Sequence, residues 1–324
     1  MPTLAKSMGL YGVKFAPYVV PINIREKAGL DLSDFQVRIL LTENNFNGWD
    51  KVEPDGTDIY ITDENGSPLP FYIELFNVSA RRGAIWTKIP SIPANGIVRI
   101  LLNFGNPDLV PTYMRDPTKV FDKVENFESG TFGVFTNVFA KDYFSITTDV
   151  VFEGTYALKV DDPSTSYGAG RYSPNRTFWD TDKKIIEIWM RVETAQYWAV
   201  YMARDNIRRF NIGFSRGNFV CYDGTEHTIG SYEANKWYKF VIFLDMPNLR
   251  TGYQIYDDLY NLLYEDYNLS MDNTSMAYTD VLIYSGVSST GVGYADLVFS
   301  RKYALPEPEV IVEGMIYRRD LDLM

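Results

Sequence analysis

Val120-Phe121-Asp122 and Glu125-Asn126-Phe127-Glu128-Ser129-Gly130 form a seam in the middle of the chain, and Glu153-Gly154-Thr155-Tyr156-Ala157-Leu158-Lys159-Val160 follows after a gap. Acidic and aromatic residues open the seam, and a glycine then starts a strand in which apolar and other residues alternate. This pattern is typical of the first strands of a β-sandwich, so the sequence predicts that a second domain begins at residue 121. Nothing in the seam indicates catalysis.

The segment before the seam reads as a series of short strands separated by turns. The turn at Asn65-Gly66 is of the hairpin type, and Gly105-Asn106-Pro107, Pro111 and Pro117 then interrupt the strands as a linker would. The pattern predicts an antiparallel β-sandwich over residues 15–120, preceded by an N-terminal arm over residues 1–14. The predicted strands are 18–24, 35–41, 58–62, 71–76, 83–89 and 97–102.

The segment after the seam has longer strands and no convincing long amphipathic helix. Residues 184–192 and 237–245 alternate well enough to be central strands, and residues 294–300 are expected to close the sheet. A second antiparallel β-sandwich is therefore predicted over residues 121–305. Pro306-Glu307-Pro308 ends it, and residues 306–324 form a C-terminal tail that is a candidate assembly arm. The predicted fold class is all-β, with two sandwiches of jelly-roll type in tandem.

Length and charge limit the possible functions. A chain of 324 residues is long enough for two domains, each with a core of its own. Its formal net charge of −11 opposes binding to the phosphates of nucleic acid and to anionic membranes. No segment approaches the ~18 apolar residues of a membrane span, and residues 1–10 lack the apolar core of a signal peptide. The expectation is no nucleic acid and no membrane insertion.

Cysteine and histidine are too scarce for several kinds of site. The single cysteine, Cys221, allows no internal disulfide and lies in a predicted strand, where an inert role is expected. The single histidine, His227, allows no zinc site with several histidines and no pair of catalytic histidines.

Four motifs in the first third resemble a known family, the domain of unknown function numbered 2341. They are Leu32-Ser33-Asp34-Phe35-Gln36-Val37, Asp55-Gly56-Thr57-Asp58-Ile59, Ile85-Trp86-Thr87-Lys88-Ile89-Pro90 and Leu102-Asn103-Phe104-Gly105-Asn106-Pro107. The family is found in archaeal, bacterial and viral proteins, commonly ahead of a lectin-like module. It has no assigned activity, so the resemblance implies an architecture and no chemistry.

The rest of the chain resembles the concanavalin A-like lectin and glucanase superfamily, in its LamG-like or carbohydrate-binding-module-like forms. The seam, Ile186-Glu187-Ile188-Trp189-Met190-Arg191 and Asn235-Lys236-Trp237-Tyr238-Lys239 carry the resemblance. Arg301-Lys302-Tyr303-Ala304-Leu305-Pro306-Glu307-Pro308 is similar to the ending of chains that pair these two modules. The superfamily includes enzymes, sugar binders and adhesion modules, and fold alone does not choose among them.

A glycoside hydrolase needs two carboxylates that face each other across the scissile bond, roughly 5–9.5 Å apart. Glucanases of the superfamily carry them on one strand as Glu-x-Asp-x-x-Glu or Glu-x-Asp-x-Glu. The comparable strand here has Glu187 and Glu193 without the middle acid, and six residues of strand separate their Cα atoms by about 20 Å. No catalytic residue is therefore predicted, and a hydrolase with divergent acids is kept as the alternative.

Sugar binding requires aromatic rings that stack on the apolar faces of pyranoses, together with a few polar groups that bind hydroxyls. The other interpretation of each ring is packing in a sandwich core, which is the commoner role. The candidate carbohydrate-binding residues are Trp179, Tyr197, Trp198, Tyr201, Asp205 and Tyr222.

A calcium ion is the possible cofactor. Sandwiches of the carbohydrate-binding type often hold one where the first strand meets the last, and the resemblance places Glu128, Glu153 and Asp296 there. Three clustered carboxylates without a cation would repel one another. The alternative is that the three are edge acids that face solvent.

The expected function is glycan binding or adhesion by a non-catalytic surface protein, a structural component of a virion or an extracellular filament. Its expected partners are a glycan or cell-surface polysaccharide and other copies of itself or other structural proteins. A virion or extracellular surface is the expected location. The alternatives are the divergent glycoside hydrolase and a scaffold without a ligand.

Overall fold

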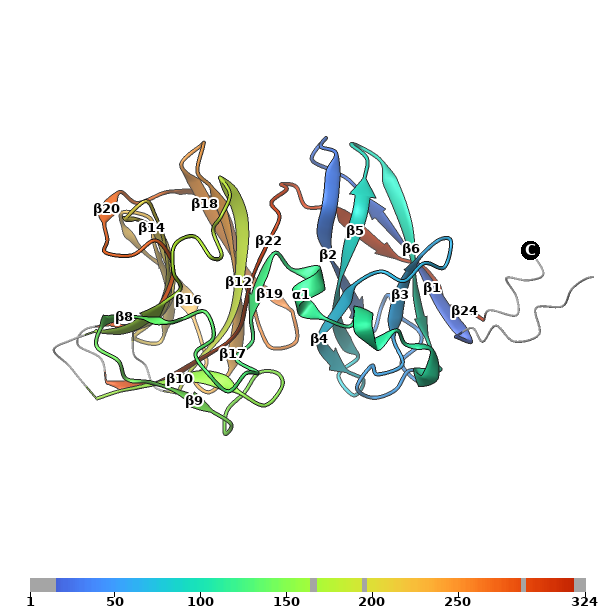
Figure 1. Cartoon of the computed structure of the whole chain (residues 1–324), viewed down its shortest axis with the longest axis horizontal. Coiled ribbons are helices and arrows are strands. Elements are labelled where there is room, and N and C mark those ends of the chain that lie inside the picture. Colours follow the sequence, from blue (N-terminus) through green and yellow to red (C-terminus); the bar gives the residue numbers. More distant parts are fainter. Residues whose placement is uncertain (1–15, 164–167, 194–196, 287–289, 318–324) are drawn as a thin grey trace, which may run out of the picture. The chain divides into compact units, whose positions relative to one another are not determined.

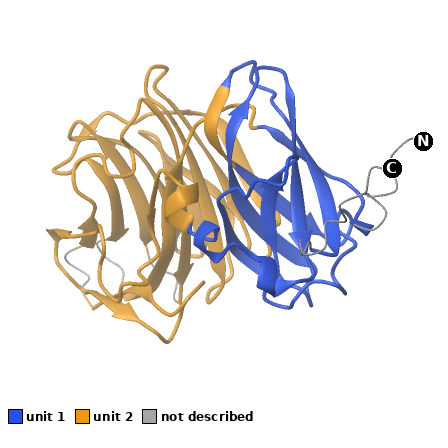
Figure 2. Ribbon diagram, turned by 45° about the vertical axis from the view of Figure 1, so that its right-hand side comes forward, with its two compact units in different colours: residues 1–31, 37–116, 308–324 blue, residues 32–36, 117–307 orange. Residues whose placement is uncertain are grey.

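Strands make up almost all of the regular structure, as the alternating pattern predicts. The computed structural model describes residues 16–163, 168–193, 197–286 and 290–317 (Figure 1). The chain divides into two compact units (Figure 2). The first unit contains residues 1–31, 37–116 and 308–324, and the second contains residues 32–36 and 117–307. The sequence places the boundaries at 120/121 and 305/306, a few residues from this division.

The first unit is built from two small antiparallel sheets. One has the strand order β23-β1-β6-β3, with β24 also pairing with β1, and the other has the order β2-β5-β4. Two short 3-10 helices, η1 (Pro107–Leu109) and η2 (Thr112–Met114), follow the last strand of the predicted first sandwich. The strands are β1 (Tyr18–Arg25), β2 (Leu32–Thr42), β3 (Tyr60–Asp63), β4 (Phe71–Asn77), β5 (Arg82–Ile92), β6 (Ile97–Phe104), β23 (Glu309–Val312) and β24 (Ile316–Tyr317).

The C-terminal tail joins the sheet of the first unit. β23 pairs antiparallel with β1, with Ile22 opposite Val312, and β24 pairs with the start of the same strand. The Glu313 carboxylate accepts a hydrogen bond from Arg99 Nη2 at 3.0 Å. Assembly of copies through this tail stays a prediction from the sequence. The predicted N-terminal arm and residues 318–324 lie outside the described residues.

The second unit has two large antiparallel sheets. The order in one is β19-β18-β17-β12-β22-β10-β9, with β7 pairing with β22, and in the other it is β16-β15-β14-β13-β21-β11-β8, with β20 pairing with β14. A short helix, α1 (Pro117–Val120), precedes them. The strands are β7 (Lys123–Glu125), β8 (Asn137–Ala140), β9 (Phe144–Thr147), β10 (Ala157–Asp162), β11 (Ala169–Tyr172), β12 (Lys183–Val192), β13 (Trp198–Arg204), β14 (Ile207–Ser215), β15 (Asn218–Tyr222), β16 (Glu226–Ser231), β17 (Trp237–Asp245), β18 (Arg250–Tyr256), β19 (Leu262–Ser270), β20 (Thr274–Ser275), β21 (Asp280–Ser285) and β22 (Gly291–Arg301).

The core of the second unit lies between its two sheets. Alternate residues of a strand point to opposite faces, and on β13 the core side chains are Trp198, Val200 and Met202. Ala199 and Tyr201, of the other parity, lie in a separate cluster on the far face of that sheet. The prediction of an all-β fold with two antiparallel sandwiches is confirmed. Within the described ranges, no helix is long and apolar enough to cross a membrane.

Candidate functional site

Aromatic side chains gather on the face of the β16–β8 sheet that points away from the core. We call this surface the tyrosine face. β13 and β21 contribute half of it, because each strand places every second residue there. Half of its members are buried and the others are partly buried, so a second apolar cluster lies outside the core between the sheets. Its members are Phe139, Tyr172, Tyr197, Ala199, Tyr201, Ala203, Met276, Tyr278, Leu282 and Tyr284.

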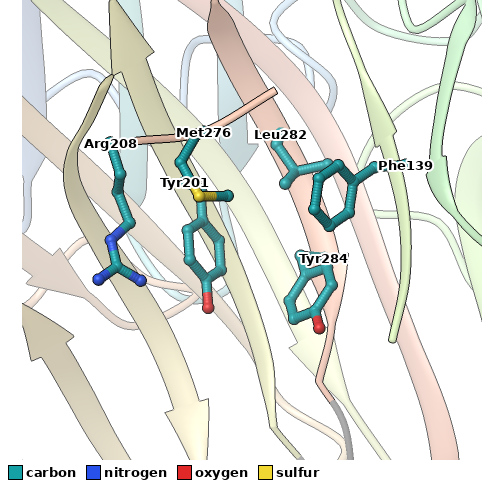
Figure 3. Close-up of a pocket in the computed structure, with 6 residues that line it drawn as sticks. All are labelled: Phe139, Tyr201, Arg208, Met276, Leu282 and Tyr284. Carbon is teal, nitrogen blue, oxygen red and sulfur yellow. The ribbon is translucent and has the colours of Figure 1, made fainter. Parts of the chain in front are cut away.

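A pocket of about 180 Å³ opens on the tyrosine face (Figure 3). Its walls come from β8, β13, β14, β21 and the residue that follows β20, so segments distant in the sequence build it together. Three rings, two aliphatic side chains and one guanidinium surround it. The lining residues are Phe139, Tyr201, Arg208, Met276, Leu282 and Tyr284.

Tyr284 organises the rings around the pocket. Its ring meets that of Tyr201 at 5.3 Å between centroids and that of Phe139 at 6.0 Å, with interplanar angles of 80° and 75°. The Tyr197 ring also meets it edge-on, at 6.4 Å. These edge-to-face arrangements are favourable for aromatic quadrupoles. They fix the four rings before any ligand arrives, which lowers the entropy cost of binding.

The tyrosine hydroxyls form a short hydrogen-bonded row. Tyr197 Oη lies 2.9 Å from Tyr201 Oη and donates to Asn211 Oδ1 at 3.2 Å. Burial raises the pKa of Tyr201 well above its ordinary value, and it also raises the pKa of Tyr197. Both phenols therefore stay neutral at physiological pH. Because Tyr197 donates its one proton to Asn211, Tyr201 donates to Tyr197, and the Tyr201 oxygen keeps the capacity to accept a hydrogen bond.

Arg208 is the charged member of the pocket wall. Its Nε donates to Asp272 Oδ2 at 2.5 Å and its Nη2 donates to Thr274 Oγ1 at 3.3 Å. Its guanidinium lies 4.3 Å from the centroid of the Tyr222 ring, a cation–π contact. The hydrogen bond and charge of Asp272 raise the pKa of Arg208 against the opposing effect of burial, so the guanidinium stays charged.

One glycine leaves room beside the pocket. A Cβ atom at Gly170, on β11, would lie 2.7 Å from Leu282 Cδ1 and 3.3 Å from Phe139 Cβ. Both neighbours line the pocket, so any side chain at this position would push the pocket wall.

The six carbohydrate-binding residues predicted from the sequence fall into three places. Tyr197 and Tyr201 belong to the tyrosine face, and Tyr222 lies beside it under Arg208. Trp179 and Trp198 are fully buried. Their rings belong to the core cluster, where they offer no surface to a sugar, and for these two the prediction does not fit the structure. Asp205 lies in the exposed turn between β13 and β14, paired with Arg176.

Five pocket residues were not predicted. Leu282 and Tyr284 alternate with the core residues Val281 and Ile283. This alternation in the sequence could have predicted that the two residues lie on the outer face of the sheet. Arg208 follows a register shift between β13 and β14 that the sequence does not reveal. Phe139 and Met276 reach the pocket only through pairing of short strands: β8 pairs with β11, and β20, just before Met276, pairs with β14.

Glu128, the first predicted calcium ligand, caps a turn. Its Oε1 accepts hydrogen bonds from the backbone N–H groups of Thr155 and Tyr156, both at 2.9 Å. Gly154 lies against the same carboxyl group at φ +68°, where a Cβ would be 2.4 Å from Glu128 Cδ. A glycine is therefore required at this point of the turn.

Asp296, on β22, binds the same turn from another side. Its Oδ2 accepts hydrogen bonds from the backbone N–H groups of Phe152 and Glu153, at 2.9 and 3.2 Å, and its Oδ1 accepts one from Leu297 at 2.8 Å. Burial raises the pKa of Asp296 well above its ordinary value, and the nearby charge of Glu153 adds to the shift.

The three acids are therefore gathered around residues 152–156, but in a different role from the predicted one. Backbone N–H donors bind the carboxylates of Glu128 and Asp296, as in other turns closed by acidic side chains. Among the described residues, no three histidine, cysteine or acidic side chains are arranged to hold a metal ion. The arrangement does not fit a calcium site.

Calcium removal tests this interpretation. Excess EDTA is expected to leave the melting temperature unchanged, because the turn is held by backbone hydrogen bonds. A site filled at 100 times its Kd would add about 2.7 kcal/mol, or about 5–10 °C for a unit of this size. A rise of that order on adding calcium, reversed by EDTA, would contradict the turn-capping role of Glu128 and Asp296.

The two glutamates of the comparable glucanase segment have separate partners. Glu187 is fully buried and ion-paired with Lys239 and Arg301. Glu193 accepts a hydrogen bond from Tyr294 Oη at 2.6 Å. None of the six described residues that line the pocket is acidic.

A family model matches part of the chain. Residues 55–136 match a domain of unknown function (DUF2341), which confirms that part of the resemblance. The match spans about a quarter of the sequence and runs past the boundary between the two units. It therefore describes this segment and not the whole chain. No curated protein matches the sequence.

Several solved structures are similar in chain path. The carbohydrate esterase of the Shiga toxin-encoding bacteriophage phi24B matches at 13% identity and a TM-score of 0.41, over 56% of this chain and 97% of that one. The cellulose-induced protein Cip1 matches at 12% and 0.38, over 55% and 96%. The family 22 carbohydrate-binding module of Clostridium thermocellum Xyn10B matches at 17% and 0.29, over 56% and 92%. Similarities this weak establish neither a site nor a function.

Proposed function

We propose that the second unit binds carbohydrate on the tyrosine face and performs no chemistry on it. One observation carries this proposal: the pocket combines fixed aromatic rings with phenol and guanidinium donors on the face of a sheet that points away from the core. Tyrosine offers an apolar ring and a polar tip in one side chain. A pyranose complements such a side chain, because its C–H groups form an apolar face that can lie on the ring and its hydroxyls can bind to the polar tip.

The small size of the pocket indicates a short recognition element. Pockets for drug-sized ligands measure roughly 300–1,000 Å³, whereas this one holds about 180 Å³. A few well-placed polar groups give orientation, and the remaining wall gives apolar contact. The pocket therefore suits one ring of a glycan, with the rest of the glycan outside it.

Binding is tested with a glycan array, followed by calorimetric titration of the strongest ligand. Tyr201→Leu keeps an apolar side chain on β13 but removes the ring and the hydroxyl, and we expect binding to weaken about tenfold or more. The matched control is Tyr267→Leu, on β19 of the other sheet, where the residue is 36% exposed. Equal weakening by the two substitutions, at unchanged melting temperatures, would contradict the placement of the site.

Two rival functions give different outcomes in the same experiments. A divergent glycoside hydrolase would release reducing ends from β-glucans or host polysaccharides, and we expect none. A scaffold without a ligand would give no array signal at millimolar sugar. Adhesion at a virion or extracellular surface remains a wider proposal from the sequence, and sedimentation of the full chain tests its self-assembly.

A further inference from the structure

The pocket has a charged end and an apolar end. Figure 3 shows the Arg208 guanidinium and the hydroxyls of Tyr201 and Tyr284 directed to the same side, with Leu282 and Met276 toward the other. A neutral sugar needs no permanent charge for recognition, because hydroxyls bind to neutral donors and acceptors. A guanidinium in the wall of so small a pocket therefore requires its own explanation.

The Arg208 guanidinium is held in place by hydrogen bonds that occupy only some of its N–H donors. Asp272 binds it through Nε, and Thr274 binds it through Nη2. Within the described part of the chain, Nη1 makes no hydrogen bond. Asp272 is itself 7% exposed and accepts hydrogen bonds from Asn273 and Thr274 on its other oxygen, so the support is rigid. A preorganised guanidinium with a free nitrogen is well suited to a carboxylate.

The other charges of the chain disfavour a ligand with many acidic groups. The net charge of −11 repels a polyanionic chain at long range. The six described lining residues include no acid that would oppose a single carboxylate inside the pocket. A volume of about 180 Å³ corresponds to roughly six waters at about 30 Å³ each, which is room for one ring.

Resting on the proposed carbohydrate binding, we infer that the pocket takes a single carboxylated sugar residue of an otherwise neutral glycan. The carboxylate binds the free Nη1 of Arg208, beside the hydroxyls of Tyr201 and Tyr284. The apolar face of the ring lies against Phe139 and Leu282. Charge-assisted hydrogen bonds are about twice as strong as neutral ones, so the carboxylate dominates the preference.

The test compares matched acidic and neutral monosaccharides on the full chain by calorimetry and ligand-observed NMR. The probes are methyl glucuronide against methyl glucoside, methyl galacturonide against methyl galactoside, and the methyl glycoside of N-acetylneuraminic acid against its carboxyl-reduced form. At least one acidic probe is expected to bind ten times or more tightly than its neutral partner. The preference should fall with added salt.

Two substitutions connect the preference to the pocket. Arg208→Met should remove the preference while binding of the neutral partner is retained, and Arg208→Lys should restore only part of it, because a lysine lacks the planar fork. Arg250→Met, at an exposed position on β18, is the matched control. If loss of the Asp272 partner unfolds Arg208→Met, Tyr284→Phe removes only a hydroxyl and should reduce the preference about threefold or more.

The outcomes separate this inference from the proposed function. Equal binding of acidic and neutral probes overturns the acidic preference and leaves carbohydrate binding intact. A preference that persists in Arg208→Met overturns the assignment of the carboxylate to this arginine. No binding of any probe, together with an empty glycan array, overturns both.

Discussion

Replacing Trp198 by alanine is expected to lower the free energy of unfolding by about 3–5 kcal/mol, the usual cost of removing a large buried aromatic side chain. The indole is fully buried and packs against Gly293, where a Cβ atom would lie 2.9 Å from Trp198 Cδ2. Its Nε1 donates a hydrogen bond to the carbonyl oxygen of Tyr294 at 3.1 Å. Urea unfolding of the full chain measures the effect.

The control for this prediction is a phenylalanine at the same position. Trp198→Phe refills part of the cavity and should cost clearly less than Trp198→Ala. Neither variant should change carbohydrate affinity under conditions in which it remains folded. If Trp198→Ala instead kept its stability and lost binding, the indole would be a sugar platform, which is one of the two roles that the sequence left open.

The second large effect is expected at Glu187, where Glu187→Gln should destabilise the chain by about 3–5 kcal/mol. Its carboxylate lies 2.5 Å from Arg301 Nε and 2.6 Å from Lys239 Nζ. Glu187 and Lys239 are fully buried and Arg301 is 1% exposed. Loss of the negative charge leaves the buried cations Lys239 and Arg301 without their shared carboxylate. Glu307 still pairs with Arg301, but it does not pair with Lys239.

Two variants check the ionic origin of this effect. Glu193→Gln, directly after the end of β12 and half-buried, should cost about 1 kcal/mol, since it alters one hydrogen bond to Tyr294. Glu187→Met combined with Lys239→Met should recover much of the loss, because apolar side chains of similar volume often replace a buried ion pair without penalty. An additive double variant would show that packing, and not charge, holds this site.

The buried ion pairs of Glu187 give a structural role to the Arg-Lys-Tyr and Glu-Pro ending, which the sequence analysis noted only as a resemblance to other chains. Arg301 and Glu307 belong to the Arg-Lys-Tyr and Glu-Pro ending, and in the structure they pair with each other while Arg301 also binds Glu187. Glu187 is the residue that a glucanase comparison first selects as a candidate acid. Its two cationic partners give it a structural role here.

Strand positions in this chain could be predicted from alternation, but the faces of the strands could not be assigned by composition. Residues 197–203 are almost entirely apolar or aromatic, so Trp198 and Tyr201 looked equally suited to a ligand. They are three residues apart, and an odd spacing places them on opposite faces of a strand. Parity therefore separates the core tryptophan from the tyrosine on the outer face, a distinction that residue type alone does not make.

The rest of the pocket depends on pairing between distant segments. Phe139 lies on a four-residue strand, and Met276 follows a two-residue strand, both too short for a reliable pattern. Arg208 reaches the pocket after a register shift at Met202 and Ala203. These positions follow from tertiary pairing, which a single sequence does not encode as a local signal.

Methyl NMR of methionine-labelled full chain tests the central claim most directly. Met276 lines the pocket, whereas Met190 and Met202 lie in the core, so one spectrum contains both the probe and its controls. A Met276→Leu variant assigns the pocket signal. On titration with the strongest glycan from the array, the Met276 methyl signal should shift to saturation while those of Met190 and Met202 stay in place. A ligand that binds without moving the Met276 signal would contradict a carbohydrate site on the tyrosine face.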